Sequence, residues 1–187
     1  MCSSDLINET KRLGGIVDDI LNLSQIQSGY FNLEKSQFSI QDMLNSVLSR
    51  YDVLSEKTRV KIQLLRSSNA ILEADKTRME QVLYNLINNA FNHTPSGGTI
   101  TMKAIDNSET VRIEISDTGC GIPKEDIPHI WDRYYKGEKT GDKKSEGTGL
   151  GLSIVKGVLE AHKATFGVES QKDVKTTFWF ELQKYKN

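Results

Sequence analysis

Three asparagines share one side of a strongly periodic segment in the middle of the chain. Residues 76–93 predict a helix with one apolar face, and Asn85, Asn89 and Asn92 fall together on its flank. Asparagine disfavours helix interiors because its amide competes with the backbone, so three on one stripe require a reason. A solvated polar flank is one reading. The other is that a neutral amide oxygen binds Mg²⁺ beside phosphates without adding negative charge.

A second motif, Asp117-Thr118-Gly119-Cys120-Gly121-Ile122, directly follows an expected strand at 111–116. A carboxylate at a strand end can accept a hydrogen bond from an exocyclic amine, and glycines let the backbone approach a planar ring closely. The pattern DxGxG is common by chance, so an ordinary turn is the alternative.

A third motif, GTGLGL at 147–152, opens an expected helix at 152–162. Alternate glycines at a helix N-terminus offer N–H groups and the positive end of the helix dipole to phosphate. The motif is neither a Walker A loop nor a dinucleotide fingerprint, because its spacing is GxGxG. A flexible linker is the alternative, although linkers do not usually lead straight into an apolar-periodic helix.

Between these loops lies the aromatic cluster Trp131-Asp132-Arg133-Tyr134-Tyr135-Lys136, which by itself is more typical of packing than of function. The segment after it is rich in lysine and glycine and has no apolar residue. We expect residues 137–147 to lack a fixed conformation without nucleotide and to order around a triphosphate. A solvated loop is the alternative.

Helices and strands alternate along the rest of the chain, and hairpin turns join neighbouring strands. A heptad pattern predicts a long helix over 3–28, which needs a partner helix. Further expected helices are 40–54, 76–93 and 152–162, and expected strands are 60–64, 70–74, 99–105, 111–116, 166–170 and 176–182. This order predicts an α+β fold with a largely antiparallel sheet.

Composition excludes several classes of protein. The 187 residues carry 24 Lys and Arg against 25 Asp and Glu, which gives a net charge of −1. A charge so close to balance does not favour binding to nucleic acid or to an anionic membrane. The apolar runs fall short of the roughly 18–20 residues of a membrane span, and the first residues lack the apolar core of a signal peptide. Two cysteines fit a reducing compartment. We therefore expect a soluble domain, or the soluble piece of a longer protein.

The order and spacing of the motifs resemble the ATP-binding domain of bacterial sensor histidine kinases, within the GHKL superfamily of gyrase, Hsp90, histidine kinases and MutL. QVLYNLINNAFNH is similar to the N box, DTGCGI and GTGLGL to the two glycine boxes, IWDRYY to the aromatic F box, and KTTFWFEL to the closing strand. The resemblance covers the whole chain. It implies that residues 1–29 are the second helix of a dimerisation and phosphotransfer hairpin, and that residues 30–187 are the ATP-binding catalytic domain.

The resemblance implies a Bergerat fold, a two-layer α/β sandwich with a mixed sheet of about five strands and three helices, and the cofactors ATP and Mg²⁺. It makes Asn89 the Mg²⁺ ligand and Asp117 the acceptor for the adenine amino group. Further contacts to ATP or ADP are implied for Asn85, Asn92, His93, Gly119, Gly121, Ile122, Tyr135, Lys136, Gly147, Thr148, Gly149, Leu150, Gly151, Leu152 and Thr176. No residue of this chain is assigned as a catalytic group.

The chain departs from the family pattern at four places. Asn92 stands where the family usually has a phosphate-binding Lys or Arg, and His93 replaces a common Tyr. Lys163-Ala164 replaces a Gly-Gly pair after the last helix, and Lys175 replaces the glycine of the closing strand. We expect the last two to alter turns outside the pocket.

None of the three histidines, His93, His129 and His162, lies in the His-[Glu/Asp]-x-x-x-Pro setting of a phosphoacceptor. The expectation is a fragment of a longer kinase that phosphorylates a histidine on the missing first helix of the hairpin. The implied partners are that hairpin and a response regulator, with no nucleic acid. The full-length protein is expected to be a homodimer anchored in the bacterial cell membrane, with this domain on the cytoplasmic side.

Two other functions remain open at this point. A hydrolase of the gyrase or Hsp90 kind would carry a glutamate general base one helical turn before the magnesium asparagine. That position is Asn85, whose amide cannot take a proton from water, so transfer is favoured over hydrolysis. A non-catalytic nucleotide-binding module, such as an anti-sigma-like domain, is disfavoured by the intact glycine boxes and the heptad helix.

Overall fold

Five strands form the main sheet in the computed structural model, which describes Gly14 and residues 32–135 and 148–185. The strand order is β2–β4–β5–β7–β6, with β2 and β4 parallel and the other neighbours antiparallel. Their bounds are Lys61–Arg66 for β2, Thr99–Asp106 for β4, Thr110–Asp117 for β5, Thr165–Gln171 for β6 and Lys175–Gln183 for β7. The predicted α+β class and the mixed, largely antiparallel sheet are confirmed.

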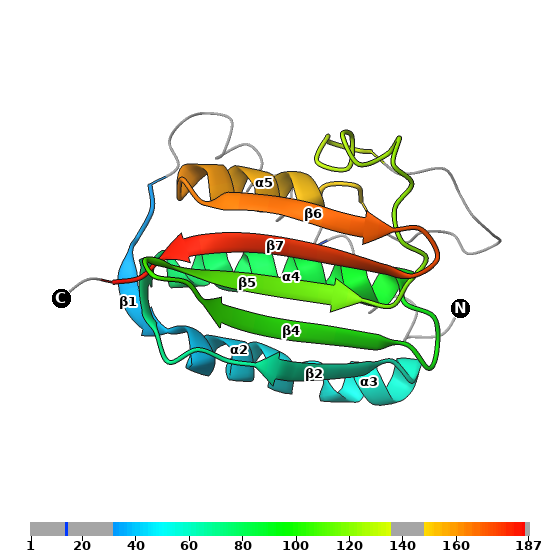
Figure 1. The fold of residues 1–187 in the computed structure, drawn as a ribbon, viewed down its shortest axis with the longest axis horizontal. Helices are drawn as coiled ribbons and strands as arrows, with labels where there is room; N and C mark the ends of the chain where they lie inside the picture. Colours follow the sequence, from blue (N-terminus) through cyan, green and yellow to red (C-terminus); the bar gives the residue numbers. More distant parts are fainter. Residues whose placement is uncertain (1–13, 15–31, 136–147, 186–187) are drawn as a thin grey trace.

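The helices of the described residues lie against one face of this sheet, behind it in Figure 1. Alternate residues of β4 and β5 are buried, because only one face of each strand meets the helices. The central helix α4 supplies seven buried apolar residues to this core, and α5 packs along α4. The helix bounds are Ile40–Ser49 for α2, Asp52–Thr58 for α3, Lys76–His93 for α4 and Gly151–Ala161 for α5.

The predicted single helix over 40–54 is wrong, because the chain breaks it at Arg50 and Tyr51 into α2 and α3. Tyr51 is 6% exposed, and its ring stacks on Phe91 of α4 with centroids 5.4 Å apart. Its hydroxyl donates to Oδ1 of Asn88 at 3.0 Å. These tertiary contacts fix Tyr51 and outweigh continued helical periodicity, so the described residues hold four helices where three were expected.

Two short strands form a separate sheet that the sequence analysis did not separate from the main one. β1 (Ser36–Ser39) pairs with β3 (Ile71–Ala74) in antiparallel register. Tyr185 connects this pair to the main sheet, because its N–H donates to the Ile71 carbonyl at 2.8 Å. The small sheet therefore closes the end of the core where β7 finishes (Figure 1).

α4 and α5 run in opposite directions, and His162 joins the start of one to the end of the other. Its Nδ1–H donates to the Val158 carbonyl at 2.8 Å, while Nε2 accepts from the Asp75 N–H at 3.1 Å. Asp75 itself caps α4 by accepting from the Arg78 N–H. The first turn of α5 therefore lies beside the middle of α4, where Asn85 is the nearest residue to Gly151.

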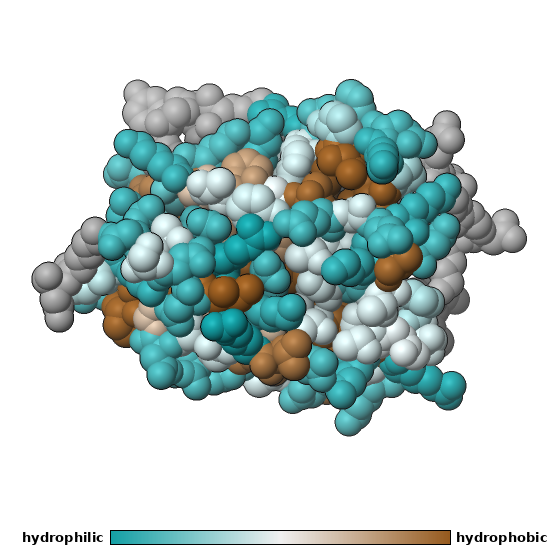
Figure 2. Space-filling view, in the orientation of Figure 1, coloured by the Kyte–Doolittle hydropathy of each residue, from teal (hydrophilic) through white to brown (hydrophobic). Residues whose placement is uncertain are grey.

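The other face of the sheet carries mostly hydrophilic side chains, with scattered hydrophobic ones among them, as Figure 2 shows. Arg112 at its centre donates to Glu114 at 2.8 Å and to Glu169 at 2.9 Å, and its guanidinium lies 4.0 Å from the centroid of Trp179. These contacts are half-exposed, so they suit a solvated surface more than a core.

Some predictions fall on residues outside the described part of the chain: the helix over 3–28, the domain boundary at 29/30, and the nucleotide-dependent order of 137–147. None of the helices that the structure describes is long and apolar enough to cross a membrane.

Candidate functional site

The N-box helix, both glycine loops and the closing strand meet at one end of the main sheet. β5 ends at Asp117 there, β7 begins at Lys175, and α5 begins at Gly151 (Figure 1). The predicted site residues that the structure describes therefore converge from four separate elements. Lys136 and Gly147 lie outside the described residues.

Asp117 is the most deeply buried carboxylate of the site, with 3% of its surface exposed. As the last residue of β5 it follows Ile113 and Ile115 on the face that meets the helices. Burial raises the pKa of this carboxyl to about 6, although the N–H of Gly119, which donates to Oδ1 at 2.9 Å, opposes the rise. An additional N–H donor from a ligand would stabilise the carboxylate where water cannot.

The first glycine loop needs its glycines to pack against neighbouring backbone. A Cβ on Gly119 would lie 2.4 Å from the His93 carbonyl oxygen. Gly121 has φ +66°, and its Cβ would lie 2.3 Å from the Gln171 carbonyl oxygen. Both glycines are thus explained by the fold alone, and the loop is fixed to the end of α4 and to the turn between β6 and β7.

Further hydrogen bonds fix the same loop. The Asp173 N–H donates to the Cys120 carbonyl at 2.7 Å, and the Ile122 N–H donates to the Ser170 hydroxyl at 2.8 Å. Thr176, 5% exposed, lies directly opposite Asp117 across the β5–β7 pair. Contacts with β5, β6 and β7 therefore fix the positions of Asp117, Ile122 and Thr176.

The two described glycines of the second loop have different roles. Gly149 has φ +73°, and a Cβ there would lie 2.9 Å from the Cα of Tyr134, whose N–H donates to the Gly149 carbonyl at 2.9 Å. At Gly151 a Cβ would meet, among the described residues, Asn85 at 3.7 Å or more, which is ordinary contact. The fold therefore explains Gly149 but leaves Gly151 without a structural reason to be glycine.

The three predicted asparagines of α4 do not share one environment. Asn85 is half-buried against Gly151, and its amide nitrogen is buried with no hydrogen-bond partner among the residues that the structure describes. Asn89 is half-buried, and Asn92 is exposed, as is His93 at the end of the helix. Asn85 therefore presents an unsatisfied donor next to the first turn of α5, where anions bind readily.

The aromatic cluster is divided between packing and surface. Trp131 makes edge contacts to Phe166 and Phe178, at 5.2 and 5.7 Å between centroids, which confirms the packing reading for this residue. The Tyr135 hydroxyl donates to Asp126 at 2.7 Å. Tyr134 is 67% exposed with φ +60°, at the edge of the residues that the structure describes.

The remaining predicted contacts lie around the first turn of α5. Leu150 is buried, and its N–H donates to the Thr148 hydroxyl at 3.3 Å. Leu152 is half-buried and packs against the core.

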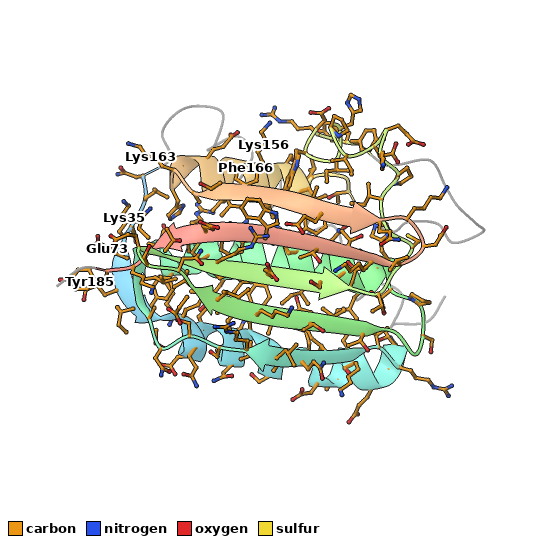
Figure 3. All side chains as sticks on the ribbon, in the orientation of Figure 1. Lys35, Glu73, Lys156, Lys163, Phe166 and Tyr185 are labelled. Carbon is orange, nitrogen blue, oxygen red and sulfur yellow. The ribbon has the colours of Figure 1, made fainter. Side chains whose placement is uncertain are left out.

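A hollow of about 160 Å³ lies at the opposite end of the sheet and is separate from this site. Figure 3 shows three of its lining residues, Lys35, Glu73 and Lys163, gathered at that end. Its lining includes none of the predicted nucleotide contacts, and cationic and anionic side chains are mixed in it. Lys163, where the family has glycine, follows α5 there with φ +54°, so that departure lies away from the site, as expected.

Residues 74–186 match the family of histidine kinase-, DNA gyrase B- and HSP90-like ATPases. This match spans more than half of the chain, and the chain belongs to that family. A similar curated protein is the sensor histidine kinase WalK of Bacillus subtilis, 33% identical over 94% of this chain. The chain spans 29% of WalK, and less than half the length of the other curated relatives compared.

Solved structures of histidine kinases share the fold. The histidine kinase ThkA, in a complex with the response regulator TrrA, matches 96% of this chain and 49% of its own with a TM-score of 0.75 and 27% identity. Full-length ShkA in complex with AMPPNP matches 98% of this chain and 38% of its own with a TM-score of 0.85 and 24% identity. The second likeness establishes the fold alone.

The sequence analysis missed Ser170, a residue that organises the site by joining Ile122 and Thr176. The alternation of β6 was a signal for the side to which Ser170 points. Its partner across the sheet depends on strand register, which a single sequence does not supply.

Proposed function

We propose that this chain is the ATP-binding catalytic part of a sensor histidine kinase, which transfers the γ-phosphoryl group of ATP to a histidine of a phosphoacceptor hairpin. One observation carries the proposal. The side chain of Asn85 packs against Gly151, whose glycine the fold does not require, and its amide nitrogen is buried without a partner among the described residues, at the same end of the sheet as the buried Asp117. A phosphate oxygen, which accepts hydrogen bonds, would satisfy the first two features, and the amino group of adenine, which donates, would satisfy the third.

The base end of the proposed site consists of Asp117, Thr176 and the loop around Ile122. Asp117 would accept a hydrogen bond from the adenine amino group, and Gly119, Gly121 and Ile122 would line the base. The depth of Asp117 supports this role, because a buried acceptor discriminates strongly against a base that offers no donor.

The phosphate end consists of Asn85, Asn92, His93 and the first turn of α5, with Tyr135 and Lys136 toward the ribose and phosphates. Residues 147–152 would surround the phosphates on the side of α5. Asn89 would hold Mg²⁺ through its amide oxygen, since hard cations prefer oxygen ligands. When bound, the ion would neutralise charge on the phosphates, while the protein positions the two ends of the nucleotide.

Transfer is favoured over hydrolysis by Asn85. Its amide is a neutral group that cannot serve as a general base to activate water. Phosphoryl transfer needs mainly positioning and charge neutralisation, which amides, backbone N–H groups and a metal ion can provide.

The relatives also support a proposal for the organisation of the whole protein. Residues 1–29 would be the second helix of the phosphoacceptor hairpin, and residues 30–187 the catalytic domain. A response regulator would receive the phosphoryl group, as the complex of ThkA with TrrA suggests. We place the domain on the cytoplasmic side of a bacterial membrane, in a homodimer whose full-length chain is membrane-anchored.

The experiment is a calorimetric titration of the chain with ADP and ATP, with and without Mg²⁺. Asn89→Ala should abolish the gain in affinity that Mg²⁺ gives, while the fold, followed by circular dichroism, stays intact. Asn88→Ala is the matched control, since this neighbour on α4 is exposed and points to Tyr51. An unchanged Mg²⁺ effect in Asn89→Ala would show that this asparagine does not hold the ion.

A further inference from the structure

A row of three polar side chains crosses the sheet beside the proposed base site. Asp117 of β5 lies opposite Thr176 of β7, and Thr176 lies opposite Ser170 of β6. The next two rows on the same face are entirely apolar: Ile115, Phe178 and Val168, then Ile113, Phe180 and Phe166. The polar row therefore lies at the boundary between the apolar core and the proposed base site.

The hydroxyl of Ser170 has three partners. It accepts from the Ile122 N–H at 2.8 Å, lies 3.1 Å from the Lys175 carbonyl oxygen, and lies 3.2 Å from the Thr176 hydroxyl. A serine hydroxyl has one proton and two lone pairs. Because a carbonyl only accepts, Ser170 must give its proton to Lys175. Both lone pairs are then filled, one by the Ile122 N–H and the other by the Thr176 O–H.

These hydrogen bonds determine the direction in which the Thr176 hydroxyl donates its proton. Its proton is committed to Ser170, so only its lone pairs remain for another group. Beside it, the ionised carboxylate of Asp117 also only accepts. The row therefore presents acceptors to a bound base, which suits an amino group and repels a carbonyl oxygen at the same ring position.

We propose that Ser170 determines base specificity by holding the Thr176 hydroxyl as an acceptor beside Asp117. The inference rests on the proposed function, in which this site binds an adenine nucleotide. Ser170 is a positioning residue, because it acts through Thr176 and Ile122. Without Ser170, the Thr176 hydroxyl is free to turn its proton toward a carbonyl oxygen, and the site loses part of its discrimination.

The test compares ADP with inosine diphosphate, which has a carbonyl oxygen in place of the adenine amino group. Calorimetry gives the ratio of the two dissociation constants for the unmutated chain and for Ser170→Ala. We expect the preference for ADP to fall about tenfold in Ser170→Ala, the size of effect typical of one buried hydrogen-bonding group. Equal weakening of both nucleotides, with an unchanged ratio, would overturn the proposal, because a merely structural role predicts that result.

Two variants complete the comparison. Ser116→Ala removes a hydroxyl that bonds Thr177 at 2.8 Å between β5 and β7, one residue along from the row, and it should leave the ratio unchanged. Ser170→Thr keeps the hydroxyl and should retain the ratio. If Ser170→Ala does not fold, Ser170→Cys takes its place, because a thiol is a weak acceptor. A folded, unmutated chain that binds no ADP would overturn the proposed function itself.

Discussion

Gly149 and Gly151 lie two residues apart, but a methyl group meets different surroundings at each. At Gly149 the backbone has φ +73° and a Cβ would lie 2.9 Å from the Cα of Tyr134. We expect Gly149→Ala to lower the free energy of unfolding by about 1–2 kcal/mol, the cost of a left-handed conformation in a residue with a side chain. At Gly151 the nearest atoms belong to Asn85, at 3.7–4.0 Å. Gly151→Ala should leave stability unchanged or raise it by up to about 1 kcal/mol, because alanine favours a helix.

The effect on ATP should be the reverse of the effect on stability. Under the proposed function, phosphate approaches the backbone at the first turn of α5, and a methyl group on residue 151 would occupy that space. We expect Gly151→Ala to weaken ATP binding at least about tenfold, equivalent to about 1.4 kcal/mol. If Gly151→Ala is stable but binds ATP weakly, Gly151 has a role in binding and not in folding.

Urea denaturation and calorimetric titration of both variants give the two quantities. If Gly151→Ala binds ATP as tightly as the unmutated chain, phosphate binding does not require a glycine at this position. If Gly151→Ala is destabilised as much as Gly149→Ala, the contact distances around Asn85 do not describe the folded chain.

Three further predictions concern the Asp117 carboxyl and the backbone of Lys163. The pKa of Asp117 is raised from 3.8 to about 6, so the folded chain loses up to about 3 kcal/mol of unfolding free energy as pH rises from 3.8 through 6. Asp117→Asn should therefore be more stable than the unmutated chain at pH 7 in thermal denaturation, while its ADP affinity falls. ADP affinity of the unmutated chain should fall about tenfold between pH 7 and pH 5 as this carboxyl is protonated, and the same titration of Asp117→Asn should show a smaller change. Lys163→Gly should raise the free energy of unfolding by about 1 kcal/mol, because Lys163 has φ +54° after α5, and a urea midpoint that does not rise would contradict this.

The periodicity of the sequence predicted the helices and strands that are determined by their own residues. The helix over 76–93 has the predicted bounds, because one apolar face and the Asp75 cap define it without help from distant residues. The break at Tyr51 was missed because its cause is a contact with Phe91, forty residues away. The parallel pairing of β2 with β4 and the separate β1–β3 sheet were missed for the same reason, since pairing depends on distant partners.

The residues of the site were proposed from motifs, but the role of each depends on three-dimensional contacts. Glycines that look equivalent in the sequence divide into Gly119, Gly121 and Gly149, which the fold requires, and Gly151, which it does not. The link from Ser170 to Thr176 requires the register of β6 on β7. The segment 137–147, expected to order around a triphosphate, lies outside the described residues, so that expectation stays a prediction.

Transfer of labelled phosphate tests the central claim most directly. The chain is incubated with Mg²⁺ and ATP labelled in the γ-phosphate, first by itself and then with a separately supplied phosphoacceptor hairpin of the same kinase. We expect acid-labile, base-stable label on the hairpin and none on this chain, whose His162 already uses both ring nitrogens in hydrogen bonds. Release of inorganic phosphate without labelling of the hairpin would contradict the account and favour a hydrolase.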